Sequence, residues 1–219
     1  MLSVIIPTLD EGERIIPTLG SLKGLVDEII VSDGGSNDDT VAMSKSFGAR
    51  VVRSVRGRGV QLKIGAEEAK GEWLLFLHAD TVLSDGWFEE TKEFMSKGLQ
   101  KAAVFQFVLD DTRQVARILE KGVSLRNKIF SLPYGDQGLL ISQLLYKELG
   151  GFKSIPVFED VDIVRRIGRR RLVFLKNFAK TSAARYTNYR IYYQSFRNLI
   201  LLLNYFLGVS PQLLARFYK

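Results

Sequence analysis

The sequence contains no cysteine and a single histidine, His78. The lack of cysteine excludes disulfides, thiol catalysis and cysteine-rich zinc sites, and it is compatible with a reducing cytoplasm. One histidine provides neither a histidine-based zinc site nor a histidine-based catalytic triad. Clusters of acidic residues remain as the main candidates for chemistry.

Long apolar runs are also missing. No stretch approaches the roughly 18 to 20 apolar residues of a membrane-spanning helix. The apolar run at residues 2–6 is too short for a signal peptide and lacks a basic flank. We therefore expect a cytoplasmic protein. The length of 219 residues suits one sizeable domain, or one domain with a short appendage.

Acidic residues are absent beyond Asp162, where 12 lysines and arginines remain. Through Asp110 the chain holds 12 basic and 17 acidic residues, a charge of −5, and after it 19 and 7, a charge of +12. A one-sided field of this kind indicates an anionic partner, which could be a phosphate, an acidic lipid surface or a nucleic acid.

The first hundred residues alternate between short apolar runs and segments of helical period. This pattern predicts an α/β fold with a parallel, Rossmann-like sheet that helices cover on both faces. Ligands of such sheets bind beyond the carboxyl ends of the strands. The expected strands are 2–6, 28–32, 50–54 and 73–77, and helices are expected at 40–47 and 60–69.

The second half of the chain is less regular. A strand is expected at 102–109, an apolar run at 139–141, and helices at 112–130 and 158–170. The helix at 112–130 carries an apolar stripe made of Val115, Ile118, Leu119, Gly122 and Leu125. We expect one domain over 1–188 and an amphipathic, basic segment over 189–219, which Gly208 and Pro211 divide into two short helices.

Polar clusters follow three of the four predicted N-terminal strands. The first is Pro7 to Glu11, the second begins at Asp33 and Gly34, and the third is His78 to Asp80. The carboxylate of Asp33 can accept hydrogen bonds from a base or ribose, or it can simply close a turn before a helix. Asp80 can supply a hard oxygen ligand to Mg²⁺ or Mn²⁺, or it can cap the next helix.

Two further clusters lie in the second half. Glu159 and Asp160 open a predicted helix, where acidic residues are favoured in any protein. Asp160 could alternatively act as a general base that accepts the proton of an attacking hydroxyl. Gly135, Asp136 and Gln137 form either a plain turn or a flexible wall that carries polar groups for the acceptor or the donor sugar.

The order and spacing of these motifs resemble the family 2 inverting glycosyltransferases of the GT-A fold. The resemblance covers Ser3 to about Arg171, and the combination of H-A-D, G-D-Q-G and E-D looks like a compact bacterial subgroup. The matching segments are V-I-I-P-T-L-D-E at 4–11, D-G-G-S-N-D-D-T at 33–40, G-R-G-V-Q-L-K-I-G-A at 57–66, L-H-A-D-T at 77–81, G-D-Q-G at 135–138, L-G-G-F at 149–152 and F-E-D-V-D at 158–162.

The resemblance implies a role for each matching residue. A UDP- or GDP-linked sugar would be the donor, and its diphosphate would be held through a metal at Asp80. Asp160, with Glu159 beside it, would be the base for an attack that inverts the anomeric carbon. The residues expected along the nucleotide or diphosphate are Pro7, Thr8, Glu11, Asp33, Arg58 and Gln61.

The sequence departs from the family pattern at three positions. His78 stands where many relatives have the first acid of a D-x-D pair, so metal binding would rest on fewer protein oxygens. Lys63 replaces a more usual asparagine, and its cation could support phosphate charge directly. Asp10 stands where asparagine is common.

Two other functions compete with glycosyl transfer. A sugar nucleotidyltransferase shares the sheet architecture but usually has a glycine-rich phosphate loop after its first strand, whereas here no glycine occurs before Gly12. A non-catalytic nucleic-acid-binding module would explain the basic C-terminal half but not the acidic clusters, so we expect no nucleic acid partner.

The C-terminal segment combines aromatic residues and leucines with the basic residues Arg185, Arg190, Arg197 and Arg216. It could form ordinary core helices with a basic rim. Alternatively, it could bind an anionic membrane surface, which would suit a lipid-linked acceptor and a peripheral location on the inner face of the cell membrane.

Overall fold

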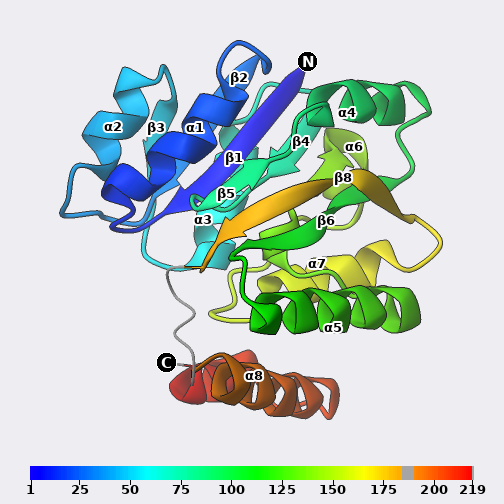
Figure 1. Cartoon of the computed structure of the whole chain (residues 1–219). Helices are drawn as coiled ribbons and strands as arrows, with labels where there is room; N and C mark the ends of the chain where they lie inside the picture. Colours follow the sequence, from blue (N-terminus) through cyan, green and yellow to red (C-terminus); the bar gives the residue numbers. More distant parts are fainter. Residues whose placement is uncertain (184–189, 219) are drawn as a thin grey trace.

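A computed structural model describes residues 1–183 and 190–218, and within the last long helix it describes side chains from residue 196 onward. One eight-stranded sheet runs through the molecule in the order β3-β2-β1-β4-β7-β6-β8-β5 (Figure 1). The strands are β1 (Leu2–Thr8), β2 (Glu28–Asp33), β3 (Arg50–Arg53), β4 (Trp73–Phe76), β5 (Thr81–Leu83), β6 (Ala102–Asp110), β7 (Leu139–Ser142) and β8 (Leu172–Ser182).

The N-terminal half of the sheet is parallel. Strand β1 pairs with both β2 and β4, and β2 pairs with β3, all in parallel. These are the four strands that the apolar runs predict. Every residue of β4 is buried, as expected for a strand covered on both faces. The carboxyl ends of β1, β2 and β4 therefore lie at one edge of the sheet.

The other half mixes directions. Strand β7 is antiparallel to β4 and β6, β8 is parallel to β6, and β5 is antiparallel to β8. The predicted strand at 102–109 is confirmed as β6, and the apolar run at 139–141 forms β7, whereas β5 and β8 were not among the predicted strands. The mostly parallel α/β fold is confirmed.

Side-chain alternation along the strands builds a core on each face of the sheet. Ile5 packs on one face with α3 (Arg58–Glu68), α6 (Gln143–Glu148) and α7 (Glu159–Ile167). Its neighbours Val4 and Ile6 pack on the other face with α1 (Ile16–Leu22) and α4 (Trp87–Ser96). Helix α2 (Thr40–Ser46) lies beside α1, at the β3 edge (Figure 1). The prediction of helices on both faces is confirmed.

Helix α5 (Gln114–Phe130) forms as predicted but turns a different face to the protein. It buries Ala116, Val123 and Asn127, and Leu119 packs beside them. Ile118 and Leu125 of the predicted stripe are 59% and 58% exposed. The apolar stripe is therefore not the buried face of α5 at these two positions, because apolar side chains lie on both sides of α5 and the smaller Ala116 packs with the end of β6.

The C-terminal segment forms α8 (Arg190–Phe206), α9 (Pro211–Leu214) and the short 3₁₀ turn η4 (Ala215–Phe217). The break falls at Gly208 and Pro211 as expected, although the 17 residues of α8 make it longer than the short helix we anticipated. Leu201, Leu202 and Leu214 join the core beside α7, so this segment packs on the domain.

The expected domain boundary at 188/189 and the side chains of Arg185 and Arg190 lie outside the described residues. Among the helices that the structure describes, none has both the length and the apolar character needed to cross a membrane.

Candidate active site at the carboxyl edge of the sheet

The carboxyl ends of β1 and β2 bring Thr8 and Asp33 together. The two residues are paired in the strand register, and the Thr8 hydroxyl donates to Oδ1 of Asp33 at 3.1 Å. Asp33 also accepts from the backbone N–H groups of Gly35 at 3.0 Å and Ser36 at 2.9 Å. Burial alone would raise the pKa of Asp33, but these hydrogen bonds outweigh it and lower the pKa, so the carboxylate stays ionised.

Asp33 therefore organises its own loop as well as facing the edge of the sheet. The interpretation that Asp33 closes a turn is therefore correct. Helix α2, however, begins at Thr40 after Asp39, with no side-chain cap from Asp33. An ionised carboxylate stands at the end of a buried strand, and it is held by four donors from the loop and from Thr8.

Gln61 ties helix α3 to the same edge. Its side-chain amide donates to the backbone carbonyls of Thr8 at 2.6 Å and Ser32 at 2.9 Å. Gly65 lets the helix approach closely, since a Cβ atom there would lie 2.4 Å from Ile5 Cγ2. The Gln61 amide thus joins α3 to β1 and β2, beside the segment where the resemblance places the nucleotide.

Pro7 and Glu11 flank this loop. Pro7 is half-buried at the end of β1, and the Glu11 carboxylate lies 3.3 Å from Arg14 Nε. The backbone N–H of Glu11 donates to the Thr40 hydroxyl at 2.8 Å, which joins the segment after β1 to the start of α2. Both residues therefore lie near Asp33.

An ion pair joins the start of α3 to the start of α7. Arg58 Nε donates to the carboxylate of Glu159, whose side chain is only 1% exposed. Burial raises the pKa of Glu159, although Arg58 counteracts this rise. Burial works against the charge on Arg58, yet Glu159 and Asp160 outweigh it and raise the pKa of the guanidinium. Arg58 is therefore protonated and compensates the acidic start of α7.

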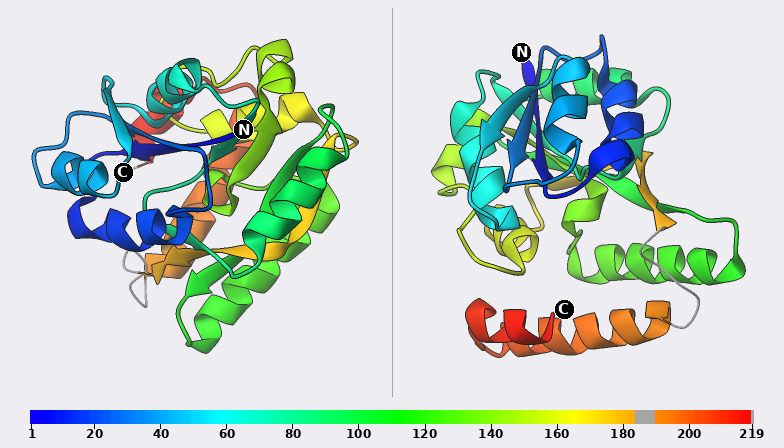
Figure 2. Two further views of the ribbon diagram at one scale, coloured as in Figure 1. Left: turned by 90° about the horizontal axis from the view of Figure 1, so that it is seen from above. Right: turned by 90° about the vertical axis from the view of Figure 1, so that its left-hand side faces the viewer.

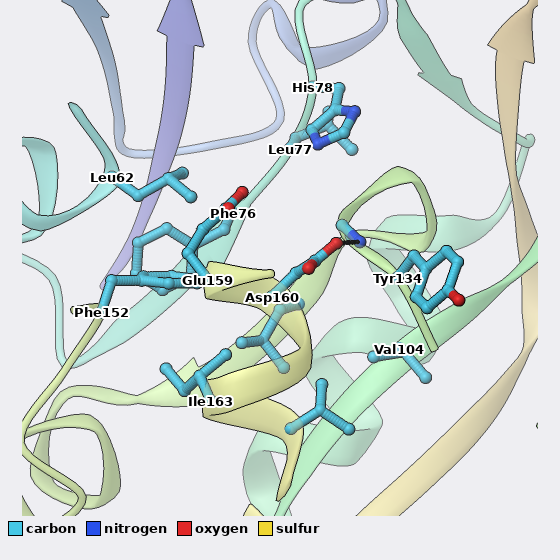
Figure 3. A pocket seen from close by; sticks show the side chains of 14 residues that line it. Leu62, Phe76, Leu77, His78, Val104, Tyr134, Phe152, Glu159, Asp160 and Ile163 are labelled. Atoms are coloured by element: carbon cyan, nitrogen blue, oxygen red, sulfur yellow. Dashed lines mark hydrogen bonds between the residues drawn. The ribbon is translucent and has the colours of Figure 1, made fainter. Parts of the chain in front are cut away.

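Asp160 lies next to Glu159 and is held by two backbone donors. The N–H of Gly135 donates to Oδ2 at 2.8 Å, and the N–H of Val161 donates to Oδ1 at 2.7 Å. A Cβ atom on Gly135 would lie 2.8 Å from His78 Nε2 and 3.4 Å from Asp160 Oδ2. Gly135 therefore lies between His78 and Asp160, two residues that line the same pocket in Figure 3. A larger residue at position 135 would require the His78 side chain to shift.

Gly135, Asp136 and Gln137 form the 3₁₀ turn η2. Burial of its carboxyl group raises the pKa of Asp136 to about 6; Arg126 opposes the rise, and Asp160 and Asp80 add to it. The Oδ1 atom of Asp136 is shielded from solvent and has no hydrogen-bond partner. This orphaned oxygen marks a position where a bound polar group would be stabilised.

Gln137 serves the fold. Its amide donates to the carbonyl of Phe105 at 2.8 Å and accepts from Asn127 Nδ2 at 3.0 Å, and the residue is fully buried. These contacts fix η2 against β6 and α5. Of the three predicted residues in this motif, Gly135 and Asp136 face the acidic cluster and Gln137 anchors them.

A small cavity lies beneath these groups, with a volume of about 20 Å³. Its lining includes His78, Tyr134, Glu159 and Asp160, over an apolar floor that contains Phe76. This volume holds about one water molecule. A nucleotide sugar is far larger and would have to lie on the open edge above the cavity.

The acidic and histidine side chains at this edge of the sheet determine which kind of metal site it can form. Among the residues that the structure describes, no group of three or more acidic or histidine side chains could hold a metal. Mg²⁺ and Mn²⁺ commonly take only one or two protein carboxylates and complete their shells with phosphate and water oxygens. Asp80 is partly exposed beyond β4, and its charge reaches Asp136. The carboxylate of Asp80 fits a metal held mainly by a diphosphate.

Most of the predicted residues thus lie along one edge. Thr8, Asp33 and Gln61 form one end of it, and Arg58, Glu159, Asp160, Gly135, Asp136 and Asp80 form the other. Lys63 is placed apart from them, because its side chain is 49% exposed on α3 and lies 4.0 Å from Glu67. Its predicted role toward phosphate stays a prediction.

Three residues near the site were not predicted. The guanidinium of Arg126 lies 3.5 Å from the ring centre of Tyr134, which precedes Gly135 directly. Tyr134 could have been noticed as the aromatic neighbour of the G-D-Q-G motif. Tyr218 reaches the acidic cluster from the far end of the chain, and no sequence pattern points to it.

Curated relatives match parts of this chain. An uncharacterized glycosyltransferase from Rickettsia typhi is 31% identical over 138 residues, which are 59% of this chain and 47% of the relative. The glucosyl-3-phosphoglycerate synthase of Mycolicibacterium paratuberculosis is 34% identical over 94 residues, 37% of this chain and 29% of that protein. The chain spans about half the length, or less, of these two relatives.

Solved structures share the fold. Residues 1–349 of S. aureus TarS align with a TM-score of 0.67 at 16% identity, covering 99% of this chain and 70% of that one. Glucosyl-3-phosphoglycerate synthase from Mycobacterium tuberculosis, solved with Mn²⁺, UDP and glucosyl-3-phosphoglycerate, aligns with a TM-score of 0.56 at 23% identity, covering 83% of this chain and 70% of that one.

The family match covers more than half of the sequence. Residues 3–142 match the model of glycosyl transferase family 2, a range that runs from β1 through β7 and includes Thr8, Asp33, Asp80 and Asp136. The expected family is therefore confirmed, and this chain belongs to glycosyl transferase family 2.

Proposed function

We propose that this protein transfers a sugar from a nucleotide-diphosphate sugar to a hydroxyl acceptor with inversion at the anomeric carbon. The supporting observation is the convergence of Asp33, Asp80 and Asp160 on the carboxyl edge of the sheet. Family membership supports the reaction class. TarS has been solved with UDP and with UDP-GlcNAc, which favours a nucleotide sugar as donor here as well.

Asp160 is the general base in this proposal. Its carboxylate accepts the proton of the acceptor hydroxyl while that oxygen attacks the anomeric carbon, and the nucleoside diphosphate leaves from the opposite face. The N–H of Gly135 fixes the orientation of Asp160, and the Arg58 charge offsets the neighbouring Glu159. Asp136, with an unpaired oxygen beside Asp160, is placed to bind the acceptor or the donor sugar.

The donor lies along the same edge in this proposal. The ionised Asp33 binds the base or ribose, with Pro7, Thr8 and Glu11 lining the pocket. Asp80 holds Mg²⁺ or Mn²⁺, which when bound supplies positive charge to the departing diphosphate. Because the metal has few protein ligands, we expect it to bind together with the nucleotide.

Asp80→Asn tests the metal site. In the wild type, UDP or GDP with Mn²⁺ should raise the melting temperature, and a ligand at 100 times its Kd adds about 2.7 kcal/mol of stability. Asp80→Asn should lose most of the Mn²⁺-dependent part of this shift, because it removes the charged ligand. The exposed Asp85 follows β5, and Asp85→Asn is the matched control that should keep the full shift.

Equal stabilisation of Asp80→Asn and the wild type would remove Asp80 from the metal site. The product distinguishes the competing enzyme class: release of nucleoside diphosphate from a sugar donor supports glycosyl transfer. Release of pyrophosphate from a nucleoside triphosphate would instead support a nucleotidyltransferase.

We also propose that the C-terminal segment binds an anionic membrane surface, which would bring a lipid-linked acceptor to the site. Its exposed apolar side chains form a stripe on α8 and continue past it, and the exposed Arg216 accompanies them, whereas Arg197 is half-buried and lies against Tyr218. The exposed side chains are Phe196, Leu199, Ile200, Leu203, Phe206, Leu207, Leu213 and Phe217. Apolar and basic groups together are the pattern of interfacial helices.

Sedimentation with vesicles tests this surface. The wild type should pellet with phosphatidylglycerol vesicles, and Leu203→Glu combined with Leu207→Glu should reduce the pelleted fraction severalfold by placing negative charge on the stripe. Leu99→Glu is the control, since Leu99 is 42% exposed on the loop after α4. Deleting 189–219 would also disturb the core, because Leu201, Leu202 and Leu214 belong to it. Equal pelleting of all variants would contradict the proposal.

A further inference from the structure

The residue before the acidic pair has an unusual backbone. Phe158 has φ 62 and ψ 23, in the left-handed region, although it is neither glycine nor asparagine. For a bulky side chain this conformation is unfavourable and persists only where the surroundings impose it. Phe158 sits directly before Glu159, so its backbone determines how α7 begins and where Asp160 points.

The surroundings that hold Phe158 come from the other end of the chain. Its ring is 7% exposed, and it packs against Tyr205 of α8 with ring centres 5.2 Å apart. The Tyr218 ring lies edge-on at 6.0 Å. Figure 2 shows the C-terminal segment running along the end of the domain that carries α7. The two tyrosines thus contact Phe158, which is the only aromatic residue among the three non-glycine residues with positive φ in the described part of the chain, the others being Asp10 and Ser131.

Two arginine guanidinium groups lie near these tyrosine rings. The guanidinium of Arg165, on α7, lies 5.9 Å from the centre of Tyr205, and that of Arg197 lies 5.8 Å from the centre of Tyr218. Leu214 is 4% exposed and packs in the same cluster. The C-terminal segment is therefore packed against α7 by aromatic, cationic and aliphatic contacts.

Tyr218 also lies close to the charged groups of the site. Burial raises the pKa of its phenol, and the carboxylates of Asp160, Glu159 and Asp136 add to the rise, while Arg58 opposes it. All four charges therefore act on this phenol, which lies at the tip of the chain. A loss of the Tyr218 ring would open space next to Phe158 and next to the Arg58–Glu159 pair.

We propose that Tyr218 and Tyr205 are positioning residues, which hold Phe158 in its left-handed conformation and through it keep Asp160 in hydrogen-bond contact with Gly135. The expected effect of the two tyrosines on catalysis rests on the proposed function, whereas their effect on the structure does not. The position of Asp160 itself can be measured without any substrate, through the N–H of Gly135 that donates to Oδ2.

Amide hydrogen exchange tests the geometry. In Tyr218→Ala, the Gly135 amide should exchange at least about tenfold faster, since its acceptor is displaced and the local opening becomes easier. Amides of β1, such as Ile5, should keep their rates, because the core there is unchanged. Tyr218→Phe keeps the ring and should restore slow exchange at Gly135. Phe217→Ala is the matched control, because Phe217 is a 61% exposed neighbour in the same turn.

Steady-state kinetics distinguish a positioning role of Tyr218 from a general contribution to the stability of the protein. With UDP-GlcNAc, UDP-glucose and GDP-mannose as donors and release of nucleoside diphosphate as readout, Tyr218→Ala should lower kcat by about 10- to 100-fold while KM for the donor stays within about twofold. Unchanged Gly135 exchange in Tyr218→Ala would overturn the inference whatever the activity. If Gly135 exchange rises but Asp160→Asn is fully active, the positioning stands and the proposed base is wrong.

Discussion

Asp160→Asn should lower the rate of sugar transfer by about 10²- to 10⁴-fold and leave nucleotide binding unchanged. The magnitude is that of removing a general base from an otherwise intact site. The asparagine side chain is nearly isosteric, and its one carbonyl oxygen can still accept from the N–H of Gly135, while the contact with the N–H of Val161 is lost because the amide NH2 group cannot accept a hydrogen bond. The measurement is the release of nucleoside diphosphate from the donor, together with the thermal shift given by UDP and Mn²⁺.

Asp162→Asn is the control for this experiment. Asp162 lies on the same helix but pairs with Lys153 at 2.8 Å and with Arg166, so its loss should lower the melting temperature while transfer continues. Transfer by Asp160→Asn at the normal rate would show that another group accepts the proton. Loss of both transfer and nucleotide binding would indicate that Asp160 acts on the donor instead.

The strands that could be predicted are those with continuous apolar runs. Strands β1 and β4 are buried on both faces, so their sequences stand out from the polar segments around them. Strand β8 buries Leu172, Leu175, Ala179 and Thr181 at irregular spacing and includes Lys176 and Asn177, so its sequence shows neither a continuous apolar run nor a strict alternation. Strand β5 has three residues, too few for any periodicity.

The position of the site could be predicted because it depends on strand direction. Asp33 and Asp80 follow parallel neighbours of β1, so the fold class alone places them at one edge. The roles of the amide side chains could not be predicted. The amide groups of Gln61 and Gln137 donate to backbone carbonyls of distant segments, and Gln137 also accepts from the side chain of Asn127; these partners come together only in the folded chain.

The contacts that the C-terminal segment makes with Phe158 could not be predicted from the sequence for a similar reason. Tyr205 and Tyr218 are separated from Phe158 by 46 residues or more, and their contact arises from the packing of α8 and α9 on α7. Apolar residues occur on both sides of α8, as they do on α5. The sequence pattern therefore shows that a helix forms without showing which side is buried.

Arg58→Met should destabilise the protein by about 2–3 kcal/mol near neutral pH, as measured by urea unfolding. Removing one partner of a buried ion pair usually costs about 3–5 kcal/mol. The Arg58 side chain is 35% exposed, which lowers this figure through solvent screening. Glu159 is left buried without its counter-ion, and burial raises its pKa. The cost should shrink as the pH falls and Glu159 takes up a proton in the folded state.

The double variant Arg58→Met with Glu159→Gln should recover most of the lost stability, because no uncompensated charge remains at the start of α7. Additive losses would show that the two residues act separately. The double variant also separates the two roles of Arg58. If it is stable and binds UDP with Mn²⁺ like the wild type, Arg58 serves only to neutralise Glu159. If it is stable but binds UDP more weakly, the guanidinium also contributes to the diphosphate site that the family resemblance implies.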